Sequence, residues 1–280
     1  MEVIQDKSFE GERSLFKLRN ALIRNCEFHD GESPLKETEN LVIENTSFKW
    51  KYPVWYAKNI KISSCNFYED TRAGFWYCED VSIDNTVIDS PKNIRRCNNL
   101  SLENVTFTDG SETLWDCNEV VLNNITLKGD YLLMNSENVK VKGLVLDGHY
   151  PFDGCSNVVV EDSKLITKDA FWNCDNVTVR NSYINGEYLG WNSKNLTFEN
   201  CVIESHQGLC YIKKLTMKNC SLINTDLSFE YCEDIDADIT SEIDSVKNPI
   251  SGVIKAKGIK ELILDESDRD RIRIEVDGNE

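Results

Sequence analysis

Residues 40–48, NLVIENTSF, and residues 99–107, NLSLENVTF, are two copies of one phrase that decides the fold. The phrase is a polar residue, an apolar–x–apolar triplet, a polar residue, Asn, a small residue, any residue and an apolar residue. It recurs at nearly constant spacing, so we expect a solenoid of stacked, similar coils. Copies begin at Asn20, Asn40, Asn59, Asp80, Asn99, Glu119, Asn138, Asn157, Asn176, Asn195, Lys214 and Asp234.

Apolar residues occupy alternate positions within each phrase, as at Val81 and Ile83 or at Val177 and Val179. A period of two is typical of a β-strand with one buried face. The coils are too short for two helices and a turn, and the leucine-rich pattern LxxLxLxxN is absent. The repeat therefore predicts an all-β, single-stranded, right-handed parallel β-helix of about 12 coils, each of roughly 19 residues.

The repeat predicts a single β-helix domain over residues 1–280. Residues 1–19 are expected to be an N-terminal cap or degenerate coil, because an open coil exposes an unpaired strand edge. Residues 20–233 are expected to form the regular coils. Residues 234–280 are expected to form degenerate coils and a C-terminal cap, in which segments 262–264 and 271–276 form a closing strand pair around the charged loop DESDRDR, residues 265–271.

Two features of the repeat describe the coil interior. The sixth place of the phrase is mostly Asn, as at Asn45, Asn104 and Asn200, which tolerates left-handed backbone at a bend and can bond to its stacked neighbours. Ten of the eleven cysteines fall in columns of small residues. We interpret them as reduced thiols packed in a narrow core, and we expect no metal site and no cofactor.

The formal net charge of −17 bears on partners and location. Its averaged field repels nucleic acid and anionic membranes, so neither is an expected partner. The first residues lack the basic start and apolar run of a secretory signal, and the odd cysteine count argues against a disulfide framework. We therefore expect a cytoplasmic protein, and the sequence leaves its oligomeric state open.

The opening FEGERSLF, residues 9–16, followed by the Asn-rich coils, resembles the pectin-lyase-like superfamily of right-handed parallel β-helices. It resembles more closely an uncharacterised bacterial family within that superfamily. The resemblance implies the fold and, for function, that many relatives bind or cleave carbohydrates. The sequence departs from polygalacturonase-like members, since it has no Asp-Asp pair, no Arg-x-Lys, and Gly148-His149-Tyr150 where they carry Gly-His-Gly.

A column four residues before each phrase holds five of the six tryptophans. The preceding place is uniformly apolar and should point inward, so the tryptophans should point outward as an aromatic stripe. Aromatic and hydrogen-bonding groups together suit sugar rings, although tryptophans half-buried over a bend would give the same pattern. The expected ligand-binding residues are Trp55, Trp76, Arg95, Arg96, Trp115, Tyr150, Trp172 and Trp191.

Charged residues interrupt this stripe near its middle, and Asp116, His149 and Asp153 are the candidate catalytic groups. Carboxylates can act as acid and base in glycoside hydrolysis, histidine can assist a lyase, and arginines can hold negative charge. A surface Arg–Asp ion pair explains the same residues without chemistry. The first hypothesis is a protein that binds or processes a small carbohydrate-like ligand, as a glycoside hydrolase, polysaccharide lyase or sugar isomerase-like enzyme if it is an enzyme. The second is a non-catalytic interaction scaffold in which the same stripe binds another protein or a second copy of itself.

Overall fold

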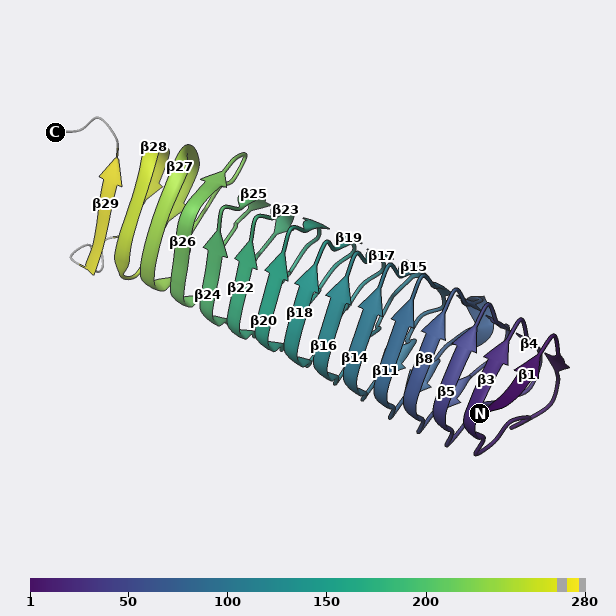
Figure 1. Cartoon of the computed structure of the whole chain (residues 1–280). Coiled ribbons are helices and arrows are strands. Elements are labelled where there is room, and N and C mark those ends of the chain that lie inside the picture. The colour runs from purple at the N-terminus through teal and green to yellow at the C-terminus, as the bar shows by residue number, and fades with distance from the viewer. Residues whose placement is uncertain (266–270, 277–280) are drawn as a thin grey trace. The chain divides into compact units, whose positions relative to one another are not determined.

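The computed structural model describes residues 1–265 and 271–276 and shows the predicted fold class. The chain is an all-β, right-handed parallel β-helix of about 14 turns with nearly no helix, and the described residues include a short 3-10 turn, η1 (Glu69–Thr71). It divides into two compact units, Met1–Lys140 and Val141–Glu280, with the boundary inside strand β18 (Glu137–Lys142). Figure 1 shows successive strands of the same side lying next to one another within each unit.

The phrase forms the first sheet of unit 1, because its alternate apolar residues point into the core. In β5, for example, Leu41 and Ile43 are buried while their neighbours are partly exposed. Each strand pairs in parallel with the equivalent strand of the next coil, as in the register of Leu41 with Ile60. The strands are β1 (Glu2–Gln5), β3 (Arg19–Arg24), β5 (Glu39–Glu44), β8 (Lys58–Ser63), β11 (Glu79–Asp84), β14 (Asn98–Glu103) and β16 (Asn118–Asn123).

The end of the phrase turns the chain into a second, shorter sheet, and a third side closes each coil. The second sheet contains β2 (Ser8–Phe9), β4 (Glu27–Phe28), β6 (Ser47–Phe48), β9 (Asn66–Phe67), β12 (Val87–Asp89), β15 (Thr106–Asp109) and β17 (Thr126–Lys128). The third side contains β7 (Val54–Trp55), β10 (Phe75–Trp76) and β13 (Ile94–Arg95), which form a small parallel sheet.

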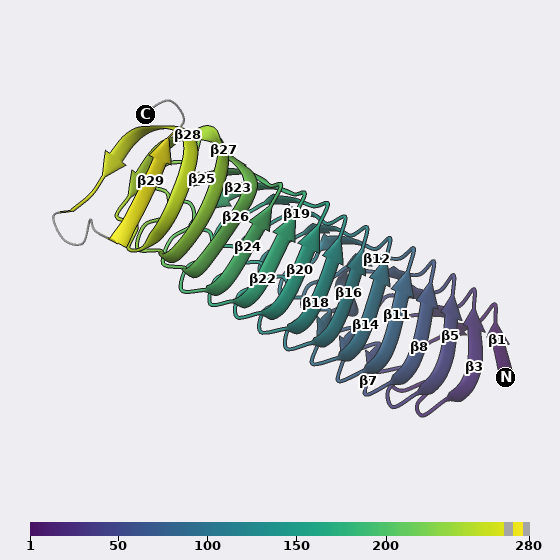
Figure 2. The same cartoon turned by 60° about the vertical axis from the view of Figure 1, so that its left-hand side comes forward.

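Unit 2 repeats the first two sheets, as the rotated view in Figure 2 also shows. Its first sheet contains β20 (Ser156–Glu161), β22 (Asp175–Arg180), β24 (Lys194–Glu199), β26 (Lys213–Leu222), β27 (Glu233–Lys247), β28 (Gly252–Ile263) and β29 (Ile272–Val276). Its second sheet contains β19 (Val145–Asp147), β21 (Lys164–Ile166), β23 (Tyr183–Glu187) and β25 (Val202–His206), and the end of β26 continues it.

Identical side chains stacked in successive coils form the core and the bends. Phe28, Phe48 and Phe67 are fully buried, with ring centroids 4.9 and 4.6 Å apart. At the bend after the first sheet the predicted asparagines have positive φ, and their side chains bond to one another, as Asn45 Nδ2 does to Asn25 Oδ1 at 2.8 Å. These ladders confirm the interpretation of the asparagine column.

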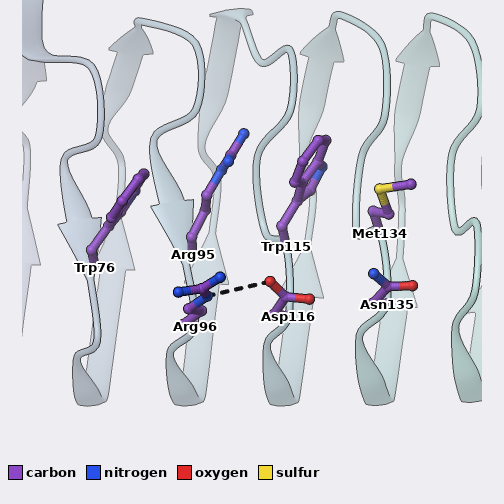
Figure 3. Close-up of a pocket in the computed structure, with 7 residues that line it drawn as sticks. All are labelled: Trp76, Arg95, Arg96, Trp115, Asp116, Met134 and Asn135. Carbon is purple, nitrogen blue, oxygen red and sulfur yellow. Dashed lines mark ion pairs between the residues drawn. The ribbon is translucent and has the colours of Figure 1, made fainter.

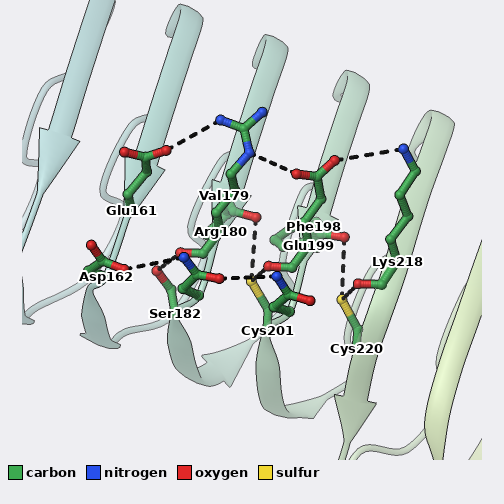
Figure 4. Close-up of polar contacts among 12 residues, drawn as sticks. Glu161, Asp162, Val179, Arg180, Ser182, Phe198, Glu199, Cys201, Lys218 and Cys220 are labelled. Carbon is green, nitrogen blue, oxygen red and sulfur yellow. Dashed lines mark hydrogen bonds and ion pairs between the residues drawn. The ribbon is translucent and has the colours of Figure 1, made fainter.

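All eleven cysteines are buried and carry thiols that form no disulfide. Figure 4 shows how they bond: Cys201 Sγ lies 3.4 Å from the Val179 carbonyl oxygen, and Cys220 Sγ lies 3.3 Å from that of Phe198. Burial raises the pKa of the Cys65 thiol to about 12, so it stays protonated at neutral pH. The thiols are therefore core side chains that donate to backbone oxygens.

The structure corrects the predicted coil count from about 12 to about 14. The first residues form a coil with paired strands, because β1 pairs with β3 in the register of Glu2 with Ala21. At the other end, β28 and β29 pair in parallel as further coil strands. Weak phrases here still have enough alternate apolar residues to make strands. Most of the predicted loop at 265–271, residues 266–270, lies outside the described residues.

The third side of unit 1 changes conformation along the coils. Strands β7, β10 and β13 form it up to Arg95, with left-handed residues such as Lys92 and Arg96 on either side of the strand; in the next coil Leu114, between Glu112 and Asp116, also has a positive φ, of 58°. Leu114 is fully buried in this left-handed conformation, which non-glycine residues seldom adopt. The candidate site lies where the strand conformation ends.

Candidate functional site

Two rows of side chains run across the third side of unit 1. The inner row consists of the residues four places before each phrase: Trp55, Trp76, Arg95, Trp115 and Met134. The outer row consists of the residues that follow them: Tyr56, Tyr77, Arg96, Asp116 and Asn135. Figure 3 shows part of both rows, in which Arg95 and Arg96, Trp115 and Asp116, and Met134 and Asn135 each share a coil.

The flat groups of the inner row stack on one another. Trp55 and Trp76 have ring centroids 5.3 Å apart and planes that differ by 4°. The Arg95 guanidinium lies between two indoles, 5.7 Å from the centroid of Trp76 and 4.0 Å from that of Trp115. Because the faces cover one another, the row presents mainly ring edges to solvent.

Arg95 is held by a carboxylate as well as by the two rings. Its Nη2 lies 2.7 Å from Glu112 Oε2, and its Nε donates to the Glu112 backbone oxygen at 3.3 Å. The Arg95 side chain is 16% exposed. Its charge and its donors are therefore engaged within the protein, and it serves as a rung of the inner row.

The tryptophans are half-buried. They therefore share features of both sequence interpretations, an outward-facing aromatic stripe and tryptophans that cover a bend. The indole N–H groups donate to backbone oxygens of the following coil, with Nε1–O distances of 2.6 Å from Trp55 to Ala73 and 2.6 Å from Trp115 to Tyr131. The rings thus cover bends of the backbone. Their outer edges remain at the surface of the third side.

The outer row is exposed and polar beyond its tyrosines. Arg96 donates from Nη1 to the Tyr77 hydroxyl at 2.7 Å, and its Nε lies 3.5 Å from Asp116 Oδ2. The Arg96 and Asp116 side chains are 57% and 43% exposed. The hydrogen bond to Tyr77 and the neighbouring Asp116 raise the pKa of Arg96, so its charge is permanent.

A pocket of about 270 Å³ lies between the two rows. Its lining brings together five of the predicted site residues, Trp76, Arg95, Arg96, Trp115 and Asp116, and adds Met134 and Asn135. The sequence prediction chose site residues by charge and aromatic character, so it did not include Met134 and Asn135. Their place in the same two columns is the sequence signal that identifies them.

The outer row holds its side chains in an unfavourable backbone conformation. Tyr77, Arg96 and Asp116 have φ of 58°, 53° and 52°. Left-handed backbone at residues other than Gly, Asn and Asp costs of the order of 1 kcal/mol each. The same conformation recurs at the equivalent place of other coils, as at Tyr211 and Tyr231 of unit 2, so it belongs to the repeat and does not by itself mark the pocket.

The remaining predicted residues lie elsewhere. Trp55 stacks on Trp76 next to the pocket. The others belong to unit 2, where Trp172 donates from Nε1 to the Tyr188 oxygen at 2.7 Å and Asp153 accepts from Asn173 at 2.8 Å. Tyr150 packs edge-on against Trp172, Trp172 contacts Trp191 at 5.7 Å, and His149 lines a separate hollow.

The described residues contain no group of three or more His, Cys, Asp or Glu side chains placed to hold a metal ion. Across the same residues, we find no helix with the length and apolar character needed to cross a membrane.

The coils and the pocket define the class: a right-handed parallel β-helix protein with a solvent-open pocket on one side of its coils. The family model described as "Protein of unknown function (DUF3737)" matches residues 2–277, and the chain belongs to this family. A search of the curated proteins found no match. The family is uncharacterised, as the resemblance in the sequence implied.

Solved structures with some similarity are also β-helices. A tailspike protein of E. coli bacteriophage HK620, in complex with pentasaccharide, has 10% identity and a TM-score of 0.44 over 92% of this chain and 62% of its own. The mannuronan C-5 epimerase A-module of Azotobacter vinelandii has 6% identity and a TM-score of 0.35 over 98% of this chain and 88% of its own. PfbA, a surface adhesin of Streptococcus pneumoniae, has 9% identity and a TM-score of 0.31 over 94% of this chain and 69% of its own.

The match spans only 62% of the tailspike chain. At these identities and TM-scores the likenesses carry no argument about ligand or chemistry. The function has to be argued from the pocket itself.

Proposed function

We propose that unit 1 binds a small, uncharged, sugar-like ligand in the pocket lined by Trp115 and Asp116. One observation carries the proposal. The run of flat groups in the inner row ends at Trp115, and the next side chain is the flexible Met134, as Figure 3 shows. The face of Trp115 opposite Arg95 is therefore the position where a sugar ring can stack, since a thioether adapts its shape to a ligand.

The hydrogen-bonding groups beside Trp115 suit hydroxyl groups. Asp116 supplies acceptors, Asn135 supplies one acceptor and two donors, and Arg96 supplies donors from its fork. They lie on neighbouring coils in one row, and in parallel sheets neighbouring strands are about 4.8 Å apart. That spacing is comparable with the distance between hydroxyl groups across one sugar ring. The site therefore fits a single ring better than a flat aromatic ligand.

The charges favour a neutral ligand over an acidic one. Arg95 is compensated by Glu112 at 2.7 Å, and Arg96 lies next to Asp116 at 3.5 Å. An acidic sugar would have to compete with these carboxylates within a chain of net charge −17. A hydroxyl-rich neutral ring meets no such competition.

The pocket supports binding more strongly than catalysis. Asp116 is the one carboxylate among its described lining residues, and glycoside hydrolysis ordinarily uses two. Asp153 and His149, the other candidate catalytic groups, do not line it. We retain catalysis at Asp116 as an alternative, which an Asp116→Asn variant with intact binding and abolished turnover would establish.

A thermal-shift screen of the full chain against neutral and acidic mono- and oligosaccharides tests the proposal, because a ligand of the folded state raises Tm. We expect a neutral sugar to raise Tm, and both Trp115→Ala and Arg96→Ala to abolish the shift. Trp191→Ala, the same substitution in the equivalent column of unit 2, is the matched control and should keep it. No shift across the library, together with self-association by light scattering, would favour the interaction scaffold instead.

We further propose that this family is part of the pectin-lyase-like superfamily, and that the protein is bacterial and works in the cytoplasm. The coil period, the asparagine ladders and the third side support the first assignment. Eleven buried cysteines that form no disulfide support a reducing compartment. Trapping free thiols in intact cells, before lysis, tests the location.

A further inference from the structure

A second hollow, of about 170 Å³, lies in unit 2 where β19, β21 and β23 end. Its walls come from three successive coils, and none of them belongs to the inner or outer row of unit 1. Among the lining residues are Asp147 from the first coil, Lys168 from the second and Glu187 from the third. The proposed sugar pocket makes no use of these groups.

The hollow offers acceptors and almost no free donors. Lys168 Nζ lies 2.9 Å from Glu187 Oε1, so its charge is already compensated. Asn185 donates from Nδ2 to Glu204 at 2.9 Å, which leaves its side-chain oxygen as an acceptor. The Asp147 carboxylate has no hydrogen-bond or ion-pair partner among the described residues. A complementary ligand must therefore bring donors.

The backbone and one apolar side chain shape the rest of the hollow. A Cβ atom on Gly186 would lie 1.9 Å from the Thr167 carbonyl oxygen, so only glycine lets the two coils approach here. Beside it, the Ile166 side chain is 36% exposed and lines the hollow. The result is a narrow space with an apolar wall and polar acceptors around it.

The local charge is negative even though Lys168 is present. Asp169, close behind the lining, is 8% exposed and accepts a hydrogen bond from Tyr150. Burial raises the pKa of Asp169, while nearby His149 and Lys168 oppose the shift. With Asp147 and Glu187, three carboxylates surround one ammonium group, and His149 adds a positive charge only when protonated. The field at the hollow favours a cation.

We propose that this hollow binds the ammonium group of a small aliphatic amine of the polyamine class. Asp147 is its charge partner, the Asn185 side-chain oxygen is a second acceptor, and Ile166 contacts the alkyl chain. Aliphatic carbon suits this wall because the described lining of the hollow contains Ile166 and no Trp, Tyr or Phe ring on which a sugar could stack. The site is independent of the function proposed for unit 1.

Isothermal titration calorimetry of the full chain with putrescine tests this assignment. We expect one site on the wild type and a roughly fivefold or greater loss of affinity in Asp147→Asn, in line with removal of a single charge contact. Asp236→Asn removes the same charge from an exposed position on β27 outside the hollow and should change affinity less than about twofold. Equal losses in both variants would mean non-specific attraction to an acidic protein and would overturn the proposal.

Lys168→Met supplies a test with the opposite sign. This variant keeps an unbranched side chain but removes the ammonium group that pairs with Glu187. The Glu187 carboxylate then becomes available to putrescine, which should bind several-fold more tightly, whereas damage to the fold would weaken binding. Absence of putrescine binding to the wild type, or weaker binding to Lys168→Met, would refute the site. Calcium binding that is lost in Asp147→Asn would identify a metal site and would equally refute it. Trp115→Ala should leave putrescine affinity unchanged, so the proposed amine site and the proposed sugar pocket are tested independently.

Discussion

The inner row of unit 1 and the equivalent column of unit 2 carry similar residues in different order. In unit 1, Trp55 and Trp76 stack with planes 4° apart, and the row continues through a guanidinium. In unit 2, the planes of Trp172 and Trp191 differ by 35°. Membership of this column thus brings the tryptophans of neighbouring coils into contact. How nearly parallel their rings are depends on the flat side chains next to them and on the hydrogen bonds of the indole N–H groups.

The outer rows differ in a second way, although both have left-handed backbone. Unit 2 uses Gly154, Asn173 and Asn192 at this place, followed by Tyr211 and Tyr231, and Asn192 donates to Asn173 at 2.9 Å. Unit 1 uses Tyr77 and Arg96 next to its pocket. Left-handed backbone at this place is therefore a property of the repeat in both units, and the units differ in which side chains it presents.

The largest effect that separates the two inner rows should come from truncating one tryptophan in each. Trp115→Ala removes ring contacts with Arg95 and a hydrogen bond to Tyr131, so we expect a loss of about 2–3 kcal/mol in the free energy of unfolding. Trp191→Ala should cost about half as much, because its N–H has no partner among the described residues. Urea denaturation measures both, and equal losses would remove the distinction.

A smaller effect is expected from the arginine clamped in the inner row. Arg95→Met deletes two cation–π contacts and leaves Glu112 with only Lys92, so we expect a loss of about 1–2 kcal/mol. Arg180→Met is the matched control in unit 2, where the arginine pairs with Glu199 and Glu161, as Figure 4 shows. The Arg180 side chain is 40% exposed. Its loss should stay below about 1 kcal/mol. A control that costs as much as Arg95→Met would show that the rings add nothing.

Arg96→Asn tests the exchange of stability for binding in the outer row. Asparagine occupies this place at Asn173 and Asn192 of unit 2 and tolerates left-handed backbone, so the variant should gain about 0.5 kcal/mol in the free energy of unfolding while losing the sugar-induced thermal shift. Unfolding curves without ligand measure the gain. A destabilised variant would mean that the contact from Arg96 to Tyr77 outweighs the backbone strain.

The smallest effect depends on pH and concerns unit 2. Burial raises the pKa of Asp169 in the folded state, so its ionised form destabilises the fold above that pKa, and the cost vanishes as the pH falls below the unfolded value. Asp169→Asn should therefore stabilise the protein by no more than about 1 kcal/mol at pH 7, and the gain should disappear on acidification. Thermal unfolding across that pH range measures it. A gain independent of pH would assign the effect to packing.

The sequence predicted the fold class and the positions of the site columns well, because both depend on local periodicity. Alternation in the phrase predicts strands such as β5, and the Asn45 column predicts a left-handed bend. The sequence predicted too few coils, because the first and last coils bury apolar residues without carrying a full copy of the phrase. Asp153 and His149 could not be assigned to a pocket from their columns alone.

Spacing along the chain by itself determined the stacked coils, the inward and outward faces and the columns from which any site is built. Only the tertiary structure decided what those columns can do. It placed Glu112 on Arg95, turned the indole faces toward one another and left Trp115 beside Met134 at the end of the flat groups. The physical reason is that column membership follows from the repeat, whereas exposure and charge depend on which side chains meet across coils about twenty residues apart.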